Sequence, residues 1–514
     1  ELARVEVGIM EDIDYETRPA ENLYCGADEN LEYPIVTELA SEYLIDNTGA
    51  GDLLSLTEAV DILNTYQIPA GGVTFNVTAG QAFNENPPAI TAAGTETDPI
   101  IFQKSGDGAN PVVADNTQDG IVLEFNGAAW ISWDAIDITD AAPEDTVRFE
   151  KAVYIFASDH ISIMNSTITD FDKYGIHVRD ASTNTLIDNN EVYYTTPYVT
   201  AQTSIYGIYA QYNADADNVT ITNNKVYGLK YASATIYGIR VWKINGTVAN
   251  NFVAITDDNN DKIYALRLDG GAVGLVINAY YNTVVLAGEA TDDSYCFYRT
   301  GTDGEMNVMD NIFINNRSGA FDHLIYDYTF VSGTWNADYN AYYTENGRMG
   351  DWGDVVCNTL EEWQTATGGD ASSVYKSVEF VDGYDLHLSG ASVGDLDLAG
   401  TPITGIETDI DGDTRNAMYP YMGADEDPDN PLLPTLESEY VIDNTGAGDL
   451  LSLTEAVDIL NAYEIPTGGI TFNVAAGQTF NENPPTITAV GTETDPIIFQ
   501  KSGEGDNPVV ADNT

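Results

Sequence analysis

Cysteine and positive charge are both scarce in this 514-residue chain. Its three cysteines, Cys25, Cys296 and Cys357, are too few for a disulfide framework, although a Cys296–Cys357 bridge stays open. Lysine and arginine number 19 against 82 acidic residues, which gives a formal net charge of -63. This charge excludes nucleic acid and anionic membrane surfaces as partners. It predicts a saline or divalent-rich habitat, where ions screen the repulsion between carboxylates.

Long apolar runs are also missing. No segment approaches the roughly 20 apolar residues that span a bilayer, so we expect no membrane insertion in this stretch. The chain starts at Glu1 without a leader, and we expect it to be a piece of a longer or processed protein.

A long internal repeat is the dominant feature of the sequence. Residues 41–117 and 438–514 differ at 11 of 77 positions, at a constant offset of 438 − 41 = 397. Gly26–Glu29 matches Gly423–Glu426 at the same offset. The repeat predicts a complete module at 41–426. It is flanked by the tail of a preceding module (1–30), linkers at 31–40 and 427–437, and the head of the next module (438–514).

The start of the module predicts a short capping helix. Ser55 and Glu58 have the spacing of a capping box, and apolar residues follow at helical spacing. Short β-rich runs come after it, with no helical pattern between them, which excludes βαβ units. The expected fold is therefore all-β, as a parallel β-helix solenoid built in tandem modules.

An asparagine recurs at intervals of 25 to 34 residues, each time just before a β-branched or aromatic run. One coil per interval would stack these side chains at about 4.8 Å, where their amides can bond from coil to coil. The predicted ladder is Asn165, Asn190, Asn224, Asn251, Asn282, Asn311 and Asn340.

A second recurrence begins with Tyr174-Gly-Ile, returns as Tyr-Gly-Ile at Tyr206 and Tyr237, and continues as Tyr264-Ala-Leu and Tyr295-Cys-Phe at matching points of the next two coils. Strand alternation directs Ile176, Val178 and their equivalents into the core. The same alternation directs one column outward, namely His177, Tyr209, Arg240, Arg267 and Tyr298, beside Arg179, Gln211, Trp242, Asp269 and Thr300.

These features resemble the right-handed parallel β-helix proteins of the pectate-lyase-like superfamily, and more closely secreted bacterial β-helix proteins with a D-x-D-G-D-x-R tail followed by G-A-D-E. Here that tail is Asp409–Arg415 and Gly423–Glu426. The resemblance implies a right-handed solenoid, an extracellular or cell-surface location and a bacterial source. The preceding tail departs from the pattern, with Tyr15 and Glu16 where the later tail has Gly412 and Asp413.

The outward columns allow three interpretations. They form a solvated face, a docking or glycan-binding face built on His177, Arg179, Tyr209, Arg240, Trp242, Arg267 and Tyr298, or an active site. Aromatic rings beside cations suit acidic sugars. The resemblance implies that a lyase would need a Lys or Arg base beside acidic residues or calcium. No acid pair indicates a reacting centre, so no catalytic residue is predicted.

The tail offers one candidate cation site. Asp409, Asp411 and Asp413 present hard oxygen ligands at alternate positions, as Ca²⁺ prefers, but no bidentate Glu follows at the EF-hand spacing. A closing turn held by Arg415 is the competing interpretation. The four histidines have no metal-ligand spacing, and no cofactor other than Ca²⁺ is predicted.

Together these observations favour a non-catalytic structural module of a giant extracellular filament or cell-surface fibre protein. Its expected partners are further copies of itself, in series and laterally. The alternatives are a multivalent carbohydrate-binding adhesin and a polysaccharide lyase or hydrolase.

Overall fold

The computed structural model divides the chain into two compact units. The first holds Glu1–Ser392, Ile403–Arg415 and Tyr421–Glu426, and the second holds Val393–Pro402, Asn416–Pro420 and Asp427–Thr514. The structure describes the backbone of 2–3 and 23–24, and residues 38–512 apart from 116–119, 143–146, 198–202, 212–217, 231–233, 259–260, 271–272, 290–291, 302, 319–321, 328–332 and 433–434.

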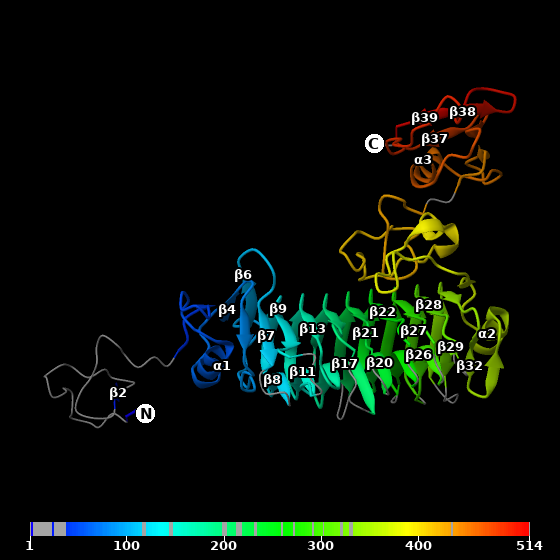
Figure 1. The fold of residues 1–514 in the computed structure, drawn as a ribbon. Helices are drawn as coiled ribbons and strands as arrows, with labels where there is room; N and C mark the ends of the chain where they lie inside the picture. The colour runs from blue at the N-terminus through cyan, green and yellow to red at the C-terminus, as the bar shows by residue number, and fades with distance from the viewer. Residues whose placement is uncertain are drawn as a thin grey trace. The chain divides into compact units, whose positions relative to one another are not determined.

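The first unit contains a solenoid of three long sheets, whose strands follow one another in a fixed rotation (Figure 1). Within these three sheets every strand pair is parallel except that of β33 with β32. Sheet 1 contains β3 (Glu42–Ile45), β4 (Val73–Thr78), β6 (Ile100–Ser105), β9 (Ala129–Asp134), β12 (Asp159–Met164), β15 (Thr185–Asp188), β18 (Asn218–Thr222), β21 (Asn245–Ala249), β24 (Val276–Tyr280), β27 (Glu305–Met309) and β30 (Thr334–Asp338).

Each coil continues from sheet 1 through sheet 2 to sheet 3. Sheet 2 contains β5 (Ala82–Asn84), β7 (Val112–Asp115), β10 (Asp137–Asp140), β13 (Thr167–Thr169), β16 (Glu191–Tyr193), β19 (Lys225–Tyr227), β22 (Phe252–Ile255), β25 (Thr283–Leu286), β28 (Ile312–Asn315), β31 (Ala341–Tyr343) and β34 (Val374–Tyr375). Sheet 3 contains β8 (Ile121–Asn126), β11 (Lys151–Phe156), β14 (Tyr174–Arg179), β17 (Ser204–Gln211), β20 (Thr235–Trp242), β23 (Ile263–Asp269), β26 (Ser294–Arg299), β29 (Asp322–Asp327), β32 (Arg348–Trp352) and β33 (Val355–Cys357). The expected all-β solenoid is confirmed.

The first unit holds two α-helices among its described residues. The predicted capping helix is α1 (Leu56–Thr65), and its N-cap Ser55 accepts a hydrogen bond from the Glu58 N–H at 3.0 Å. Its apolar face, including Leu56 and Leu63, is buried in the same core as the coils. At the other end, α2 (Leu360–Thr367) buries Trp363 completely. Cys296 and Cys357 are buried free thiols, so the bridge that the sequence left open is not formed. Cys25 lies outside the described residues.

The asparagine ladder runs along the turn between sheets 1 and 2. Each ladder amide donates to the side-chain oxygen of the asparagine in the next coil at 2.9–3.0 Å, from Asn190 as far as Asn340. The same amide also donates to a backbone carbonyl of the preceding coil, as Asn251 does to Ile221. Because these side chains are nearly inaccessible to water, the ladder satisfies turn groups that nothing else could reach.

Asn165 is not a member of this ladder. Its coil places Ser166 there instead, whose N–H donates to Asn190 Oδ1 at 3.1 Å. Asn165 stands one position earlier, in the left-handed backbone conformation (φ 53°) shared with Asn189 and Asn223. A pattern of adjacent asparagines cannot tell the left-handed position from the buried one, since asparagine suits both.

The second unit contains the second copy of the repeated segment, residues 438–512. Its strands β35 (Glu439–Ile442), β36 (Ile470–Ala475) and β38 (Ile497–Ser502) form one parallel sheet, β37 (Thr479–Asn481) pairs with β39 (Val509–Ala511), and α3 (Leu453–Ala462) is the counterpart of α1. Its contacts copy those of the first unit. Phe472 and Phe499 stack at 4.6 Å, as Phe75 and Phe102 do. Gln500 donates to Asn473 at 2.9 Å, the distance found between Gln103 and Asn76.

We predict that Asn251→Ala lowers the free energy of unfolding by about 3 kcal/mol, because the Asn224 N–H and buried carbonyls lose their partners. Urea unfolding followed by circular dichroism measures the change. The control is Asn336→Ala, an exposed asparagine that bonds only along the outer face of sheet 1. It should cost less than about 1 kcal/mol. Equal losses in the two variants would contradict a special role for the ladder.

Candidate functional site

The outer face of sheet 3 carries the predicted columns in consecutive registers. The strand pairs align His177 with Tyr209, then Arg240, Arg267 and Tyr298, which we call the mixed column. The neighbouring position aligns Arg179 with Gln211, Trp242 and Asp269 in the same way. Ile176 and Val178 point into the core, as the alternation predicts. The structure therefore brings the predicted face residues together on one surface.

Sheet 3 carries a second outward column, which strict alternation of side chains along a strand does not predict. Its members form one stacked cluster on the outside of sheet 3, because the alternation of inward and outward side chains breaks at Gly175 and its equivalents Gly207 and Gly238, while the strand register stays the same. A Cβ built on Gly175 would come within 2.8 Å of Val192, so this position faces inward and the tyrosine before it turns outward. We call Tyr174, Tyr206, Tyr237, Tyr264 and Tyr295 the tyrosine column.

The tyrosine column is a continuous stack. Ring centroids of successive members lie 4.5–5.1 Å apart, with interplanar angles of 9–14°. Four of the five rings are at most 9% exposed. Burial raises the pKa of Tyr174 to about 12, and it raises those of Tyr237 and Tyr264 as well. These hydroxyls therefore keep their protons at ordinary pH and cannot act as phenolate bases.

The two arginines of the mixed column share one buried carboxylate. Asp269 Oδ2 lies 3.2 Å from Arg240 Nη2 and 2.8 Å from Arg267 Nε, and its side chain is only 1% exposed. Both guanidinium groups also lie over tyrosine rings, Arg240 over Tyr209 at 4.9 Å and Arg267 over Tyr298 at 4.9 Å. One of these two positive charges is therefore compensated within the protein, which weakens the attraction of this face for an external anion.

His177 is enclosed by aromatic rings. It stacks on Tyr174 at 4.2 Å and on Tyr209 at 5.3 Å. It is 2% exposed, and neither ring nitrogen has a hydrogen-bond partner among the described residues. Burial, reinforced by nearby Lys151 and Arg179, lowers the pKa of His177 to about 3. The imidazole is therefore neutral at ordinary pH and serves as a stacking ring.

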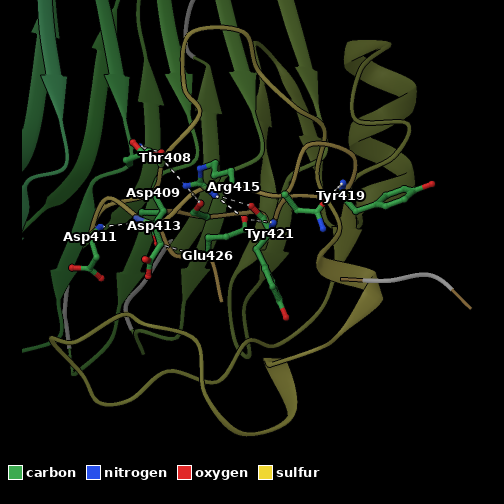
Figure 2. A network of polar contacts seen from close by, with 12 residues as sticks. Thr408, Asp409, Asp411, Asp413, Arg415, Tyr419, Tyr421 and Glu426 are labelled. Atoms are coloured by element: carbon green, nitrogen blue, oxygen red, sulfur yellow. Dashed lines mark hydrogen bonds and ion pairs between the residues drawn. The ribbon is translucent and has the colours of Figure 1, made fainter. Parts of the chain in front are cut away.

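The closing tail, residues 403–415 and 421–426 of the first unit, is the other candidate region (Figure 2). Asp409 is buried, and its oxygens accept the backbone N–H groups of Asp411, Asp413 and Glu426 at 2.8–3.0 Å. Both oxygens of Asp409 are thus used to hold the turn. Asp413 is exposed.

Arg415 ties this turn to the solenoid. Its guanidinium donates to Asn250 Oδ1 at 2.8 Å and to Gly423 O at 3.0 Å, and it lies 3.9 Å from the ring centroid of Tyr281. Glu426 Oε2 lies 3.5 Å from Arg415 Nη1. This arrangement is the closing turn that the sequence offered as the competing interpretation of the aspartates.

One group in the tail has the donors of a metal site. Among the residues that the structure describes, His387, Asp411 and Asp425 are the single group of His, Cys, Asp or Glu whose ligand atoms converge, all within 4.8 Å of one another. Of the three predicted aspartate ligands, only Asp411 belongs to it. His387 and Asp425 escaped the sequence analysis, since 24 residues separate His387 from Asp411 and no local spacing joins them.

Comparison with known proteins bears on the fold. A family model described as "Right handed beta helix region" matches residues 109–253 and 151–329. No curated protein matches the sequence. Among the described residues, no helix is long and apolar enough to cross a membrane.

Several solved structures are similar at low identity. An alginate lyase from Paenibacillus sp. is 13% identical, with a TM-score of 0.29 over 58% of this chain and 93% of that one. A lacto-N-biosidase from Eubacterium ramulus is 12% identical, with a TM-score of 0.33 over 65% and 67%. A pectate lyase is 11% identical, with a TM-score of 0.33 over 76% and 97%.

We predict that His177 makes the protein less stable in mild acid. The unfolded ring takes up a proton below its ordinary pKa of 6.5, whereas the folded ring resists protonation down to about 3. The contribution of the neutral His177 ring to the free energy of unfolding is therefore complete above pH 6.5. It is lost as the pH falls, by about 2 kcal/mol at pH 5. His177→Phe keeps the stack and should flatten the slope of stability against pH between 6.5 and 5. His160→Phe, on a partly exposed histidine, is the control.

We also predict that Asp269→Asn lowers the free energy of unfolding by about 3 kcal/mol, because two partly buried arginines lose their buried counter-charge. The matched control is Asp180→Asn, which breaks the more exposed pair with Arg179 and should cost less than about 1 kcal/mol. Chemical unfolding at low and high salt measures both. A loss at Asp269 no larger than that at Asp180 would refute the compensation argument.

Proposed function

Taking the right-handed parallel β-helix as the premise, we propose that this chain is a structural stretch of an extracellular filament or cell-surface fibre protein. Complete β-helix modules follow one another in it, and the modules are not catalytic. The modules give the filament its length and stiffness, because each coil stacks directly on the one before it. Neighbouring copies in the same chain, and copies in adjacent strands, are the partners that this role requires.

The observation that carries the proposal is the repetition of the same internal contacts in both copies of the module head. Glu85 accepts the N–H groups of Leu56 and Thr57 at 2.8 and 3.0 Å, and Glu482 accepts those of Leu453 and Thr454 at 2.8 and 2.9 Å. These residues cap a helix in both copies, so their near-identity supports selection for the fold of the repeated segment. An enzyme gains little from identical active sites in series.

The chemistry of sheet 3 also supports a non-catalytic role. A lyase needs a basic group that can give up its proton near neutral pH. Here Arg240 and Arg267 form ion pairs with Asp269, and hydrogen bonding to Asp293 raises the pKa of Lys262. Burial raises the pKa values of Tyr174, Tyr237 and Tyr264, so their hydroxyls stay protonated. None of these described groups is prepared to remove a proton from a sugar.

A glycan-binding adhesin is the second candidate, and one observation favours it. Trp242 is partly exposed at the edge of the face, and Lys243 Nζ lies 5.0 Å from its ring centroid. An exposed indole beside an ammonium group is a suitable platform for a sugar ring with a carboxylate. Repeated modules would multiply such weak contacts into firm attachment.

The full chain should release no unsaturated sugar from alginate or polygalacturonate, monitored by ultraviolet absorbance, and should show no saturable binding to either. Electron microscopy of native material, with antibodies against residues 41–426, should label regular filaments. Saturable binding lost in Trp242→Ala but kept in Lys104→Ala, a sheet 1 control, would favour the adhesin instead. Product release abolished by Arg240→Ala would overturn the non-catalytic proposal.

A further inference from the structure

We propose that His387, Asp411 and Asp425 form a binding site for a divalent transition-metal ion, with Zn²⁺ as the best chemical match. The site lies where the closing tail packs against sheet 2, on a small apolar cluster that includes Phe252, Leu386 and Ala424. It is separate from the outer face of sheet 3, and it does not depend on the structural role proposed above.

The donor set is the first argument. One imidazole nitrogen and two carboxylates are ligands that Zn²⁺ takes in three-ligand sites, with further positions left for water. The three ligand atoms lie within 4.8 Å of one another, so they can surround one ion with only small side-chain movements. His387 Nε2 already lies 2.5 Å from Asp411 Oδ2. A metal ion placed there would take over the position of the shared proton.

The orientation of His387 is the second argument. Its other ring nitrogen, Nδ1, is hydrogen-bonded to Asp385. A carboxylate that holds one imidazole nitrogen fixes the tautomer and directs the other nitrogen toward the metal, and this pairing accompanies most metal-binding histidines. The ring also packs edge-on against Phe252, with centroids 5.0 Å apart. His387 is therefore held in place before any ion arrives.

The burial of Asp425 is the third and independent argument. This residue is 8% exposed, and its Oδ2 accepts the Leu388 N–H at 2.7 Å. A largely buried carboxylate beside a histidine and a second carboxylate is costly without a cation. Lys225 Nζ lies 3.6 Å from Asp411 Oδ1, on the partly exposed side of the cluster, and it can move into solvent when an ion binds.

The preceding module tail supports the same assignment. At the offset of 397, Asp411 and Asp425 correspond to Asp14 and Asp28, and both carboxylates are retained. Gly412 and Asp413 are replaced there by Tyr15 and Glu16. The two proposed ligands thus persist in a tail whose neighbouring loop positions have changed.

The test uses the full 514-residue chain, stripped with a chelator and kept at about 0.3 M NaCl so that its acidic surface is screened. Equilibrium dialysis against Zn²⁺, with metal analysis, should give one tightly bound Zn²⁺ ion per chain. We expect His387→Gln and Asp425→Asn each to lower the Zn²⁺ affinity at least tenfold, and Asp385→Asn to lower it by about tenfold. Asp413→Asn, an exposed carboxylate in the same turn, is the matched control and should bind as the wild type does.

A second measurement needs no variant of the site. The chain has four histidines, so ¹⁵N-histidine labelling gives four imidazole signals. Zn²⁺ should shift one of these imidazole signals, and the shifted signal should remain when the three histidines other than His387 are replaced by Gln. A tight equivalent that survives His387→Gln would overturn the proposal. So would several weak equivalents with no shifted imidazole, which would mean that Zn²⁺ binds only the general acidic surface.

Discussion

Hydrogen bonding between consecutive coils is the constraint on which the rest of this structure depends. Parallel strands pair in register along three sheets, and from Asn190 to Asn340 a side-chain amide at the turn between sheets 1 and 2 reaches both neighbouring coils. These coils therefore offer the same kind of residue at the same place. This requirement explains why the sequence looks periodic although its loops differ in length. It also explains why side chains of one kind line up on the outside.

Columns on the outer face follow from the same constraint. Once Tyr206 is in register with Tyr237, their rings lie one strand spacing apart, a distance that suits stacking. Arg240 and Arg267 occupy consecutive places, and one buried aspartate serves both. Much of the scarce positive charge is thus used within the protein. The surface that faces the surroundings is left predominantly acidic.

Parts of this arrangement could be predicted from the sequence because they are local in the repeat. The register of the mixed column follows from aligning the recurring phrases, and α1 follows from Ser55 and the apolar spacing after it. The outward turn of the tyrosine column could not be predicted, because it depends on Gly175 facing inward against Val192, a residue of another sheet. Asn165 was misplaced by a single position. The cluster of His387, Asp411 and Asp425 is formed by folding the tail back onto sheet 2, which no spacing encodes.

The last strand of sheet 3 carries a consequence for how such modules vary. Because β33 runs antiparallel to β32 and α2 follows it, this end of the solenoid carries a cap in place of another parallel coil. A further turn of the solenoid is then expected by insertion between existing coils, which leaves this cap unchanged. Related modules are expected to differ in length by whole turns, while their first and last turns stay the same.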